Sequence, residues 1–153
     1  MANTYTQIYI QIVFAVQERQ NLISPKYKDE LYKYITGIVR NKSQKLITIN
    51  GMPDHLHLLI GLKPTMALSN LIKIVKSDSS KFINNKKWML GKFSWQEGFG
   101  AFSYSKSQLD DVINYIKNQE THHSRKTFKD EYTRLLEKFG IEYNNKYLFK
   151  WLD

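Results

Sequence analysis

Apolar and polar side chains alternate over residues 4–16, a pattern typical of a strand with one buried face. The apolar residues on that shared face are Ile8, Ile10, Ile12, Phe14 and Val16. Residues 45–49 and 55–62 predict two further strands, separated by the turn residues "NGMPD". Residues 101–105 predict a short fourth strand. The polar–apolar pattern therefore indicates a β-sheet built from short, widely spaced segments.

Helical spacing of apolar residues appears in the two segments between these strands. The first, residues 24–42, opens with Ser24 and Pro25, which favour an N-cap and a first helical position. The second, residues 65–83, has the buried stripe of an amphipathic helix.

Two more helices are expected after the last strand. One runs from Ser105 or Ser107 to about His123, and the other is capped by Thr127 and stopped by Gly140. The remaining residues, 141–153, predict a packed tail. No linker or internal repeat interrupts the chain, so we expect one domain over residues 1–153.

The element order, β-α-β-β-α-β followed by helices, predicts an α+β fold of the ferredoxin-like, split β-α-β type. Such a fold has one antiparallel sheet with two helices on one face. Strand side chains alternate, so Leu56, Leu58, Ile60 and Leu62 would face those helices. His55 and His57 would lie on the opposite face with Leu59 and Gly61. The later helices, those that carry a tyrosine, are the expected cover for that face.

The net charge of the chain indicates which kind of partner the protein binds. The chain holds 23 Lys and Arg against 14 Asp and Glu, a net charge of +9, with the basic residues spread along its length. Such an excess favours nucleic acid first and anionic membrane second. Ten Tyr, eight Phe and three Trp offer surfaces for stacking bases, although an aromatic core explains them equally well.

Other bulk features narrow the class of protein. No cysteine is present, which excludes disulfides and thiolate chemistry. No apolar run reaches the roughly 18 residues that span a bilayer, and no signal-peptide pattern opens the chain. We therefore expect a cytoplasmic protein with no membrane partner.

His55 and His57 place two imidazoles side by side, at a separation suited to one divalent metal ion. Two ligands alone make a weak site, and inert polar residues on a wet face are the alternative. Asp54 is either an orienting partner for an imidazole or a turn residue after Pro53. The pair needs a third ligand.

The third predicted helix offers one. Tyr115 and Gln119 lie one turn apart on the flank of its apolar stripe, so a phenol and a carboxamide project together. If that flank meets the histidine face, Gln119 supplies a carbonyl oxygen and Tyr115 lies beside the metal. His122 and His123 follow near the helix end, where histidines commonly complement the helix dipole, and are not counted as ligands.

The segments "DHLHLLI" and "YIKNQETHH" resemble the single-tyrosine HUH transposases of simple insertion sequences, the TnpA type. In that motif two histidines flank a bulky hydrophobic residue, here Leu56, and a tyrosine precedes a glutamine by four residues. "INGMPDHLHLL", "SSKFIN" and "FSWQEGFGAFSYS" also look like blocks of the family, in the right order. The similarity covers most of residues 5–149, with no departure at the motif positions.

The resemblance implies an enzyme that cuts and rejoins single-stranded DNA at hairpins near the ends of a mobile element. Tyr115 would attack a backbone phosphorus and form a 5′-phosphotyrosine link. His55, His57 and Gln119 would hold Mg²⁺ or Mn²⁺, which stabilises charge in the transition state. Rejoining would need no ATP, in agreement with the absence of a Walker-type glycine loop.

The resemblance also implies a homodimer, because one tyrosine per chain must serve two ends. The helix around Tyr115 would dock on the histidine face of its own chain or of its neighbour. Phosphate contacts are expected from basic side chains across the molecule. They are Lys73, Lys76, Lys81, Lys86, Lys87, Lys92, Arg125 and Lys126.

Two alternatives remain at the level of sequence. A basic ferredoxin-like domain is also the architecture of RNA-binding modules, and "EGFGAFSY" faintly echoes their glycine–aromatic motif. The echo has an acidic Glu97 where a basic residue belongs and an extra position at Ala101. The other alternative keeps the chemistry in a domesticated nuclease that acts on genomic repeat hairpins, or in a replication-nicking enzyme.

Overall fold

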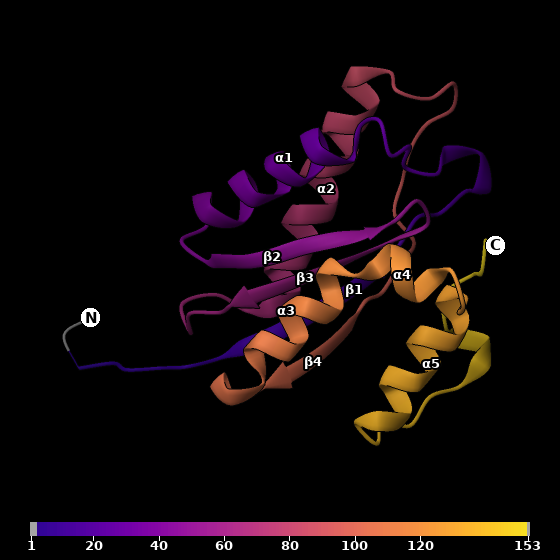
Figure 1. The fold of residues 1–153 in the computed structure, drawn as a ribbon. Helices are drawn as coiled ribbons and strands as arrows, with labels where there is room; N and C mark the ends of the chain where they lie inside the picture. The colour runs from indigo at the N-terminus through magenta and orange to yellow at the C-terminus, as the bar shows by residue number, and fades with distance from the viewer. Residues whose placement is uncertain (1–2, 153) are drawn as a thin grey trace.

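Four antiparallel strands form one sheet in the structure, a computed structural model that describes residues 3–152 (Figure 1). The spatial order is β2-β3-β1-β4, so β3 and β1 are the central strands. The strands are β1 (Tyr9–Ala15), β2 (Lys45–Met52), β3 (His55–Gly61) and β4 (Gly100–Tyr104). This order and the two crossover helices confirm the predicted α+β, ferredoxin-like fold.

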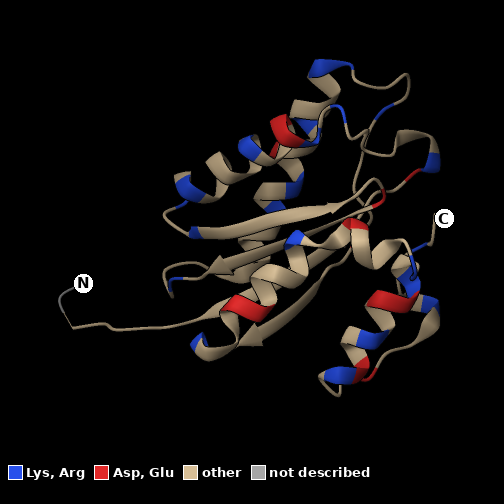
Figure 2. Cartoon of the chain, in the orientation of Figure 1, with Lys and Arg blue, Asp and Glu red and all other residues tan. Residues whose placement is uncertain are grey.

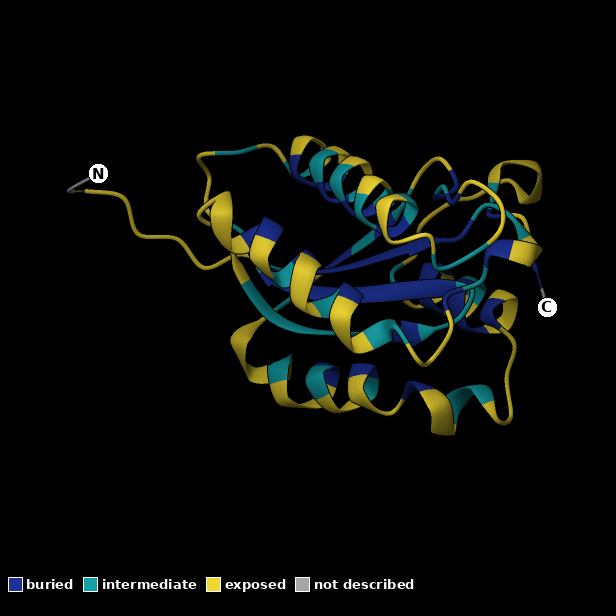
Figure 3. Ribbon diagram, turned by 90° about the horizontal axis from the view of Figure 1, so that it is seen from above, coloured by how far each residue is buried: buried dark blue, intermediate teal, exposed yellow. Residues whose placement is uncertain are grey.

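The helices α1 (Lys28–Asn41) and α2 (Leu68–Lys86) cover one face of the sheet. Leu56, Leu58 and Ile60 of β3 belong to the core that these helices share with the sheet, as the alternation predicts. Viewed from above, the buried strands lie between helices on both sides (Figure 3). The main apolar core therefore lies on the α1–α2 side.

The opposite face is covered by α3 (Leu109–Lys117), α4 (Gln119–His123) and α5 (Phe128–Lys138). Leu59 of β3 packs there with Val112 and Ile116 of α3 in a smaller apolar cluster. Helices α3 and α4 also contact the edge strand β2. The expectation that the later helices cover the histidine face is confirmed.

The β2–β3 turn is tighter than the predicted "NGMPD". Strand β2 continues through Met52, which pairs with His55, so only Pro53 and Asp54 form the turn. Pairing of residues 50–52 with β3 satisfies their backbone groups and extends the strand. The short turn places His55 at the very start of β3.

The first helix begins at Lys28, so the prediction of Ser24 as its N-cap was wrong. The Ser24 hydroxyl accepts a hydrogen bond from the Lys26 backbone N–H at 3.2 Å, and the Tyr27 N–H reaches the Ser24 carbonyl. These bonds close a turn before the helix, a use of serine that competes with capping.

The predicted continuous helix up to about His123 is broken at Asn118, between α3 and α4. Asn50 of β2 donates from Nδ2 to the carbonyls of Ile116 and Lys117, both at 3.0 Å. In an uninterrupted helix those two carbonyls would accept from the N–H groups four residues later. A contact from the sheet therefore ends α3, and α4 restarts one residue later.

Helix α5 has the predicted boundaries at both ends. The Thr127 hydroxyl accepts from the Asp130 N–H at 3.2 Å, and Gly140 follows the helix with a left-handed φ of 63°. The tail then returns to the body, where Phe149 and Leu152 are buried. The predicted packed tail is confirmed for residues 148–152, whereas residues 141–147 are exposed.

Between residues 3 and 152, none of the helices has the length and apolar character required to cross a bilayer. This agrees with the sequence, which contains no long apolar run.

Gly100 of β4 lies directly beneath Tyr132 of α5, so Gly100→Ala tests how α5 is seated. An added Cβ would lie 2.6 Å from the Tyr132 hydroxyl oxygen, far closer than atoms pack. We expect a loss of about 1–3 kcal/mol in the free energy of unfolding, measured by chemical denaturation. The matched control is Gly37→Ala in α1, where a Cβ meets nothing within 4 Å and stability should hold or rise. Equal stabilities for the two variants would contradict this packing.

Candidate active site

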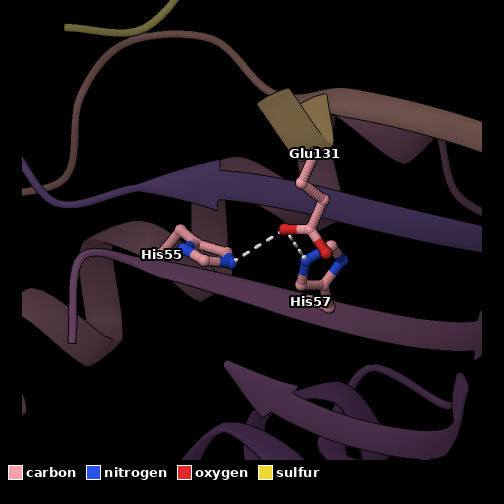
Figure 4. A group of neighbouring side chains, drawn as sticks. All are labelled: His55, His57 and Glu131. Carbon is pink, nitrogen blue, oxygen red and sulfur yellow. Dashed lines mark hydrogen bonds and ion pairs between the residues drawn. The ribbon is translucent and has the colours of Figure 1, made fainter. Parts of the chain in front are cut away.

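His55 and His57 lie next to each other on the buried outer face of β3, with neither side chain exposed. Their Nε2 atoms point to a single oxygen, Oε1 of Glu131 on α5, each at 3.1 Å (Figure 4). One donor atom from each of the three residues lies within 4.8 Å of the others. Two imidazole nitrogens and a carboxylate oxygen form a donor set that divalent metals use. The residues present therefore fit a metal ion.

Each imidazole is oriented from behind by a polar partner. His55 donates from Nδ1 to the Asp54 carboxylate at 2.7 Å, so Asp54 both forms the turn and orients the ring. His57 Nδ1 accepts from the amide of Gln11 at 3.0 Å, and Gln11 in turn accepts from the Tyr104 hydroxyl at 2.7 Å. Such partners leave both Nε2 atoms facing the same point.

Tyr115 and Gln119 reach the same carboxylate from the helices above the sheet. The Tyr115 hydroxyl donates to Oε2 of Glu131, and the Gln119 amide donates to that oxygen at 3.0 Å. The Gln119 carbonyl oxygen lies 3.1 Å from His55 Nε2. The structure therefore brings together all four residues that the sequence selected for nucleophile and metal, within one chain.

Glu131 was not selected by the sequence analysis. An acidic residue in the first turn of a helix usually complements the helix dipole at the surface. The available signal was its spacing: Glu131 lies three residues after Phe128 and four before Leu135, within the buried stripe of α5. A carboxylate on an apolar stripe requires polar partners from elsewhere in the fold. One of them is His123, whose Nε2 lies 2.9 Å from Oε1.

The charges at the site are coupled through Glu131. Burial alone would raise the pKa of Glu131, but the imidazoles of His57, His123 and His55 outweigh it and hold that pKa far below its usual range. Burial lowers the pKa of His57. For His55, burial is outweighed by hydrogen bonds to Asp54 and Glu131, which raise its pKa to about 9.

The surroundings of Tyr115 disfavour the phenolate, which is the reactive form of a tyrosine nucleophile. Burial first, and the charge of Glu131 second, raise the pKa of Tyr115 above its ordinary value. The hydroxyl is therefore protonated at neutral pH. Positive charge near the histidine pair would lower the pKa of Tyr115.

The family described as "Transposase IS200 like" matches residues 4–119, about three quarters of the chain. The chain belongs to this IS200-like transposase family. The match confirms the resemblance found in the sequence, and it favours a transposase over a plain RNA-binding module.

Similar proteins agree with this membership. The ISDra2 transposase TnpA of Deinococcus radiodurans is 23% identical over 118 residues, which cover 74% of this chain and 84% of that protein. A crystal structure of a candidate transposase from D. radiodurans R1 matches the fold with a TM-score of 0.59 and 20% identity, covering 76% of this chain and 94% of that one. A REP-associated tyrosine transposase bound to a REP hairpin matches with a TM-score of 0.60 and 14% identity, over 79% and 72% of the two chains.

A cleft of about 410 Å³ opens beside Tyr115, between the sheet edge and α5. Its lining combines aromatic and basic residues, among them Tyr104, Lys126, Arg134 and Lys138. The Lys138 ammonium lies over the Tyr104 ring, 5.8 Å from its centroid. Of the basic residues selected from the sequence, Lys126 lines this cleft, and Arg125 and Lys126 line a neighbouring one near Asp54.

Of the other selected lysines, four lie on α2, on the opposite side of the sheet (Figure 2), and two lie in the segment that follows α2. They are Lys73, Lys76, Lys81, Lys86, Lys87 and Lys92. Lys76 is engaged internally: its ammonium donates to the carbonyls of Gln96 at 2.8 Å and Gly98 at 2.6 Å, and burial lowers its pKa to about 8. Lys86 pairs with Glu30 of α1 at 3.3 Å. The structure does not bring this group to the tyrosine.

The site makes a direct prediction for metal binding. We expect the protein to bind Mn²⁺ without DNA and to melt at a higher temperature in its presence, because the folded state alone presents the ligands. His57→Ala should abolish both effects, whereas Gln11→Ala, which removes only an orienting partner, should weaken binding by about 10–100-fold. Calorimetric titration measures the affinity and a thermal scan the shift. His122→Asn is the control, and unchanged Mn²⁺ affinity in His57→Ala would contradict the site.

Proposed function

We propose that this IS200-like transposase cuts and rejoins single-stranded DNA through a covalent link to Tyr115. The Tyr115 oxygen attacks a backbone phosphorus, the bond from phosphorus to the 3′ oxygen breaks, and that oxygen takes a proton in place of the one the phenol loses. The products are a 3′-hydroxyl end and a 5′-phosphotyrosine. One observation carries the proposal: the Tyr115 hydroxyl lies against the carboxylate that both imidazoles contact.

The expected ion is Mg²⁺ or Mn²⁺, held by His55 and His57 with an oxygen from Gln119 or Glu131. When bound, it supplies a Lewis acid for the phosphate oxygens and positive charge near the phenol. The chain's own residues do the rest. Asp54 and Gln11 keep the imidazoles aimed, and Glu131 and Gln119 keep Tyr115 and His55 within reach of each other.

The covalent link also explains rejoining. A phosphotyrosine is itself a phosphodiester, so the energy of the broken bond is retained in the protein–DNA link. A 3′-hydroxyl can attack that phosphorus, release the Tyr115 oxygen and restore a DNA backbone without ATP.

The cleft beside Tyr115 supports a single DNA strand as the substrate. Lys126, Arg134 and Lys138 supply positive charge for backbone phosphates, and Tyr104 supplies an aromatic face. Hairpins are proposed at the DNA ends because a structural relative is described as bound to a REP hairpin. The selected lysines on α2 and in the segment after it, apart from the internally bonded Lys76, are proposed to contact phosphates of the hairpin stem.

The proposed assembly is a homodimer, because each chain carries one nucleophilic tyrosine and excision of an element requires two cuts. Within its own chain, the Tyr115 hydroxyl contacts the Glu131 carboxylate that both imidazoles also contact, which supports a first cut made within one chain. Rejoining of two ends then brings the two sites of a dimer together.

Tyr115→Phe removes the nucleophile and should abolish the adduct while leaving hairpin binding intact. The assay incubates a labelled single-stranded hairpin with its flanks and Mn²⁺, and then resolves SDS-resistant protein–DNA adducts on a gel. The matched control is Tyr147→Phe, which changes an exposed tyrosine far from the site's contacts and should form adduct like the wild type. Adduct formation by Tyr115→Phe would contradict the proposal.

A mixture of Tyr115→Phe and His57→Ala chains tests whether the first cut occurs within one chain. Each variant lacks a different part of the site, so a tyrosine acting on its own chain's histidines leaves the mixture inactive. Recovery of adduct in the mixture, on the His57→Ala chain, would show that Tyr115 acts in the partner's site.

A further inference from the structure

Glu131 belongs to a part of the chain that the family match does not reach, since that match ends at residue 119. We call residues 128–152, which hold α5 and the tail, the C-terminal segment. Glu131 is 5% exposed, and both oxygens of its carboxylate contact residues of the candidate site. Oε1 faces His55, His57 and His123, and Oε2 faces Tyr115 and Gln119.

We propose that Glu131 is a further catalytic residue, which ties the nucleophile to the ion. One carboxylate oxygen completes the ion site with the two imidazoles, and the other holds the hydroxyl of Tyr115. A carboxylate offers about four lone-pair sites over its two oxygens, so one oxygen can face the ion while the other accepts from the hydroxyl. The inference rests on the proposed function for the role of Tyr115, but its claim about the ion stands on the donor atoms alone.

The burial of Glu131 supports a functional carboxylate. Burying a charge carries a large desolvation free energy unless the charge is paired and hydrogen-bonded. An apolar residue at this position of the buried stripe would carry no such penalty. Here the contacts are divided between the two groups that the chemistry must bring together. A purely structural ion pair needs only one of those groups.

Packing and hydrogen bonds of the C-terminal segment fix the position of Glu131. Phe128, one turn before it, stacks on the His55 ring at 3.9 Å with 3° between the planes. Tyr132, the next residue, packs on Gly100 and on Phe149 of the tail. The tail is itself fixed by two hydrogen bonds between Gln96 and the backbone of Lys150. The segment therefore positions one carboxylate over the histidine face.

A blocking role for Glu131 predicts the reverse behaviour. If its carboxylate only occupied the place of the ion, removal would strengthen ion binding and speed cleavage. The two roles therefore differ in the sign of the effect, which makes a simple substitution decisive.

The experiment compares the full chain with Glu131→Gln, Glu131→Asp and the control Glu137→Gln. Glu137 lies on the same helix and is exposed, and its carboxylate accepts a hydrogen bond from the Tyr143 hydroxyl instead of contacting the site. Mn²⁺ binding is measured by calorimetry or by the loss of the free-ion electron paramagnetic resonance signal, without DNA. Adduct formation with the hairpin substrate is then followed at saturating Mn²⁺, and a thermal scan verifies folding.

We expect Glu131→Gln to weaken Mn²⁺ binding by at least about tenfold and to slow adduct formation at saturating ion, with Glu137→Gln unchanged. Glu131→Asp keeps the charge but shortens the reach, so it should retain more ion binding than Glu131→Gln while still slowing the adduct. If Glu131→Gln does not fold, the Mn²⁺ affinity of Glu131→Asp tests the proposal in its place. Mn²⁺ affinity equal to or above that of the wild type in the folded variants would overturn the proposal.

Failure of the proposed function gives a different result. If the wild type forms no adduct on any hairpin, yet Mn²⁺ binding still depends on Glu131, then the ion site stands and the strand-cutting role of Tyr115 falls. If adduct forms normally in folded Glu131→Gln, then Tyr115 stands and the link through Glu131 falls.

Discussion

The buried carboxylate of Glu131 connects the elements that carry the candidate site residues. Glu131 is buried between the sheet and the later helices, and its charge must be compensated there by polar partners. Imidazoles from β3, a hydroxyl from α3 and an amide from α4 supply that compensation. Four elements thus meet at one carboxylate, and the positions of the candidate nucleophile and metal ligands depend on it.

The β2–β3 hairpin helps to position the residues that contact Glu131. The two-residue turn at Pro53 and Asp54 starts β3 at His55 and sets the Asp54 carboxylate against its ring. Asn50, just before that turn, ends α3 by taking two of its carbonyls. The same hairpin therefore orients one imidazole and determines where the helix with Tyr115 stops.

Family membership covers the sheet and the helix of Tyr115, whereas α5 and the tail lie beyond the matched residues. The C-terminal segment contributes the Glu131 carboxylate, part of the cleft lining and the aromatic packing that holds α5 in place. Four of the lysines selected from the sequence lie on α2, across the sheet from the tyrosine.

Periodicity alone determined the sheet, its two covered faces and the presence of His55 and His57 on the outer one, because side-chain direction in a strand follows from position. It also placed Tyr115 and Gln119 one turn apart, although the helix between them is broken. The late start of α1 has a local cause, the hydrogen bonds from the backbone of Lys26 and Tyr27 to Ser24. The helix break and the contacts of Glu131, in contrast, were decided by tertiary structure. Both depend on hydrogen bonds between residues more than sixty positions apart in the chain. Local sequence rules consider only neighbouring residues, so they cannot predict hydrogen bonds between residues that are far apart in the chain.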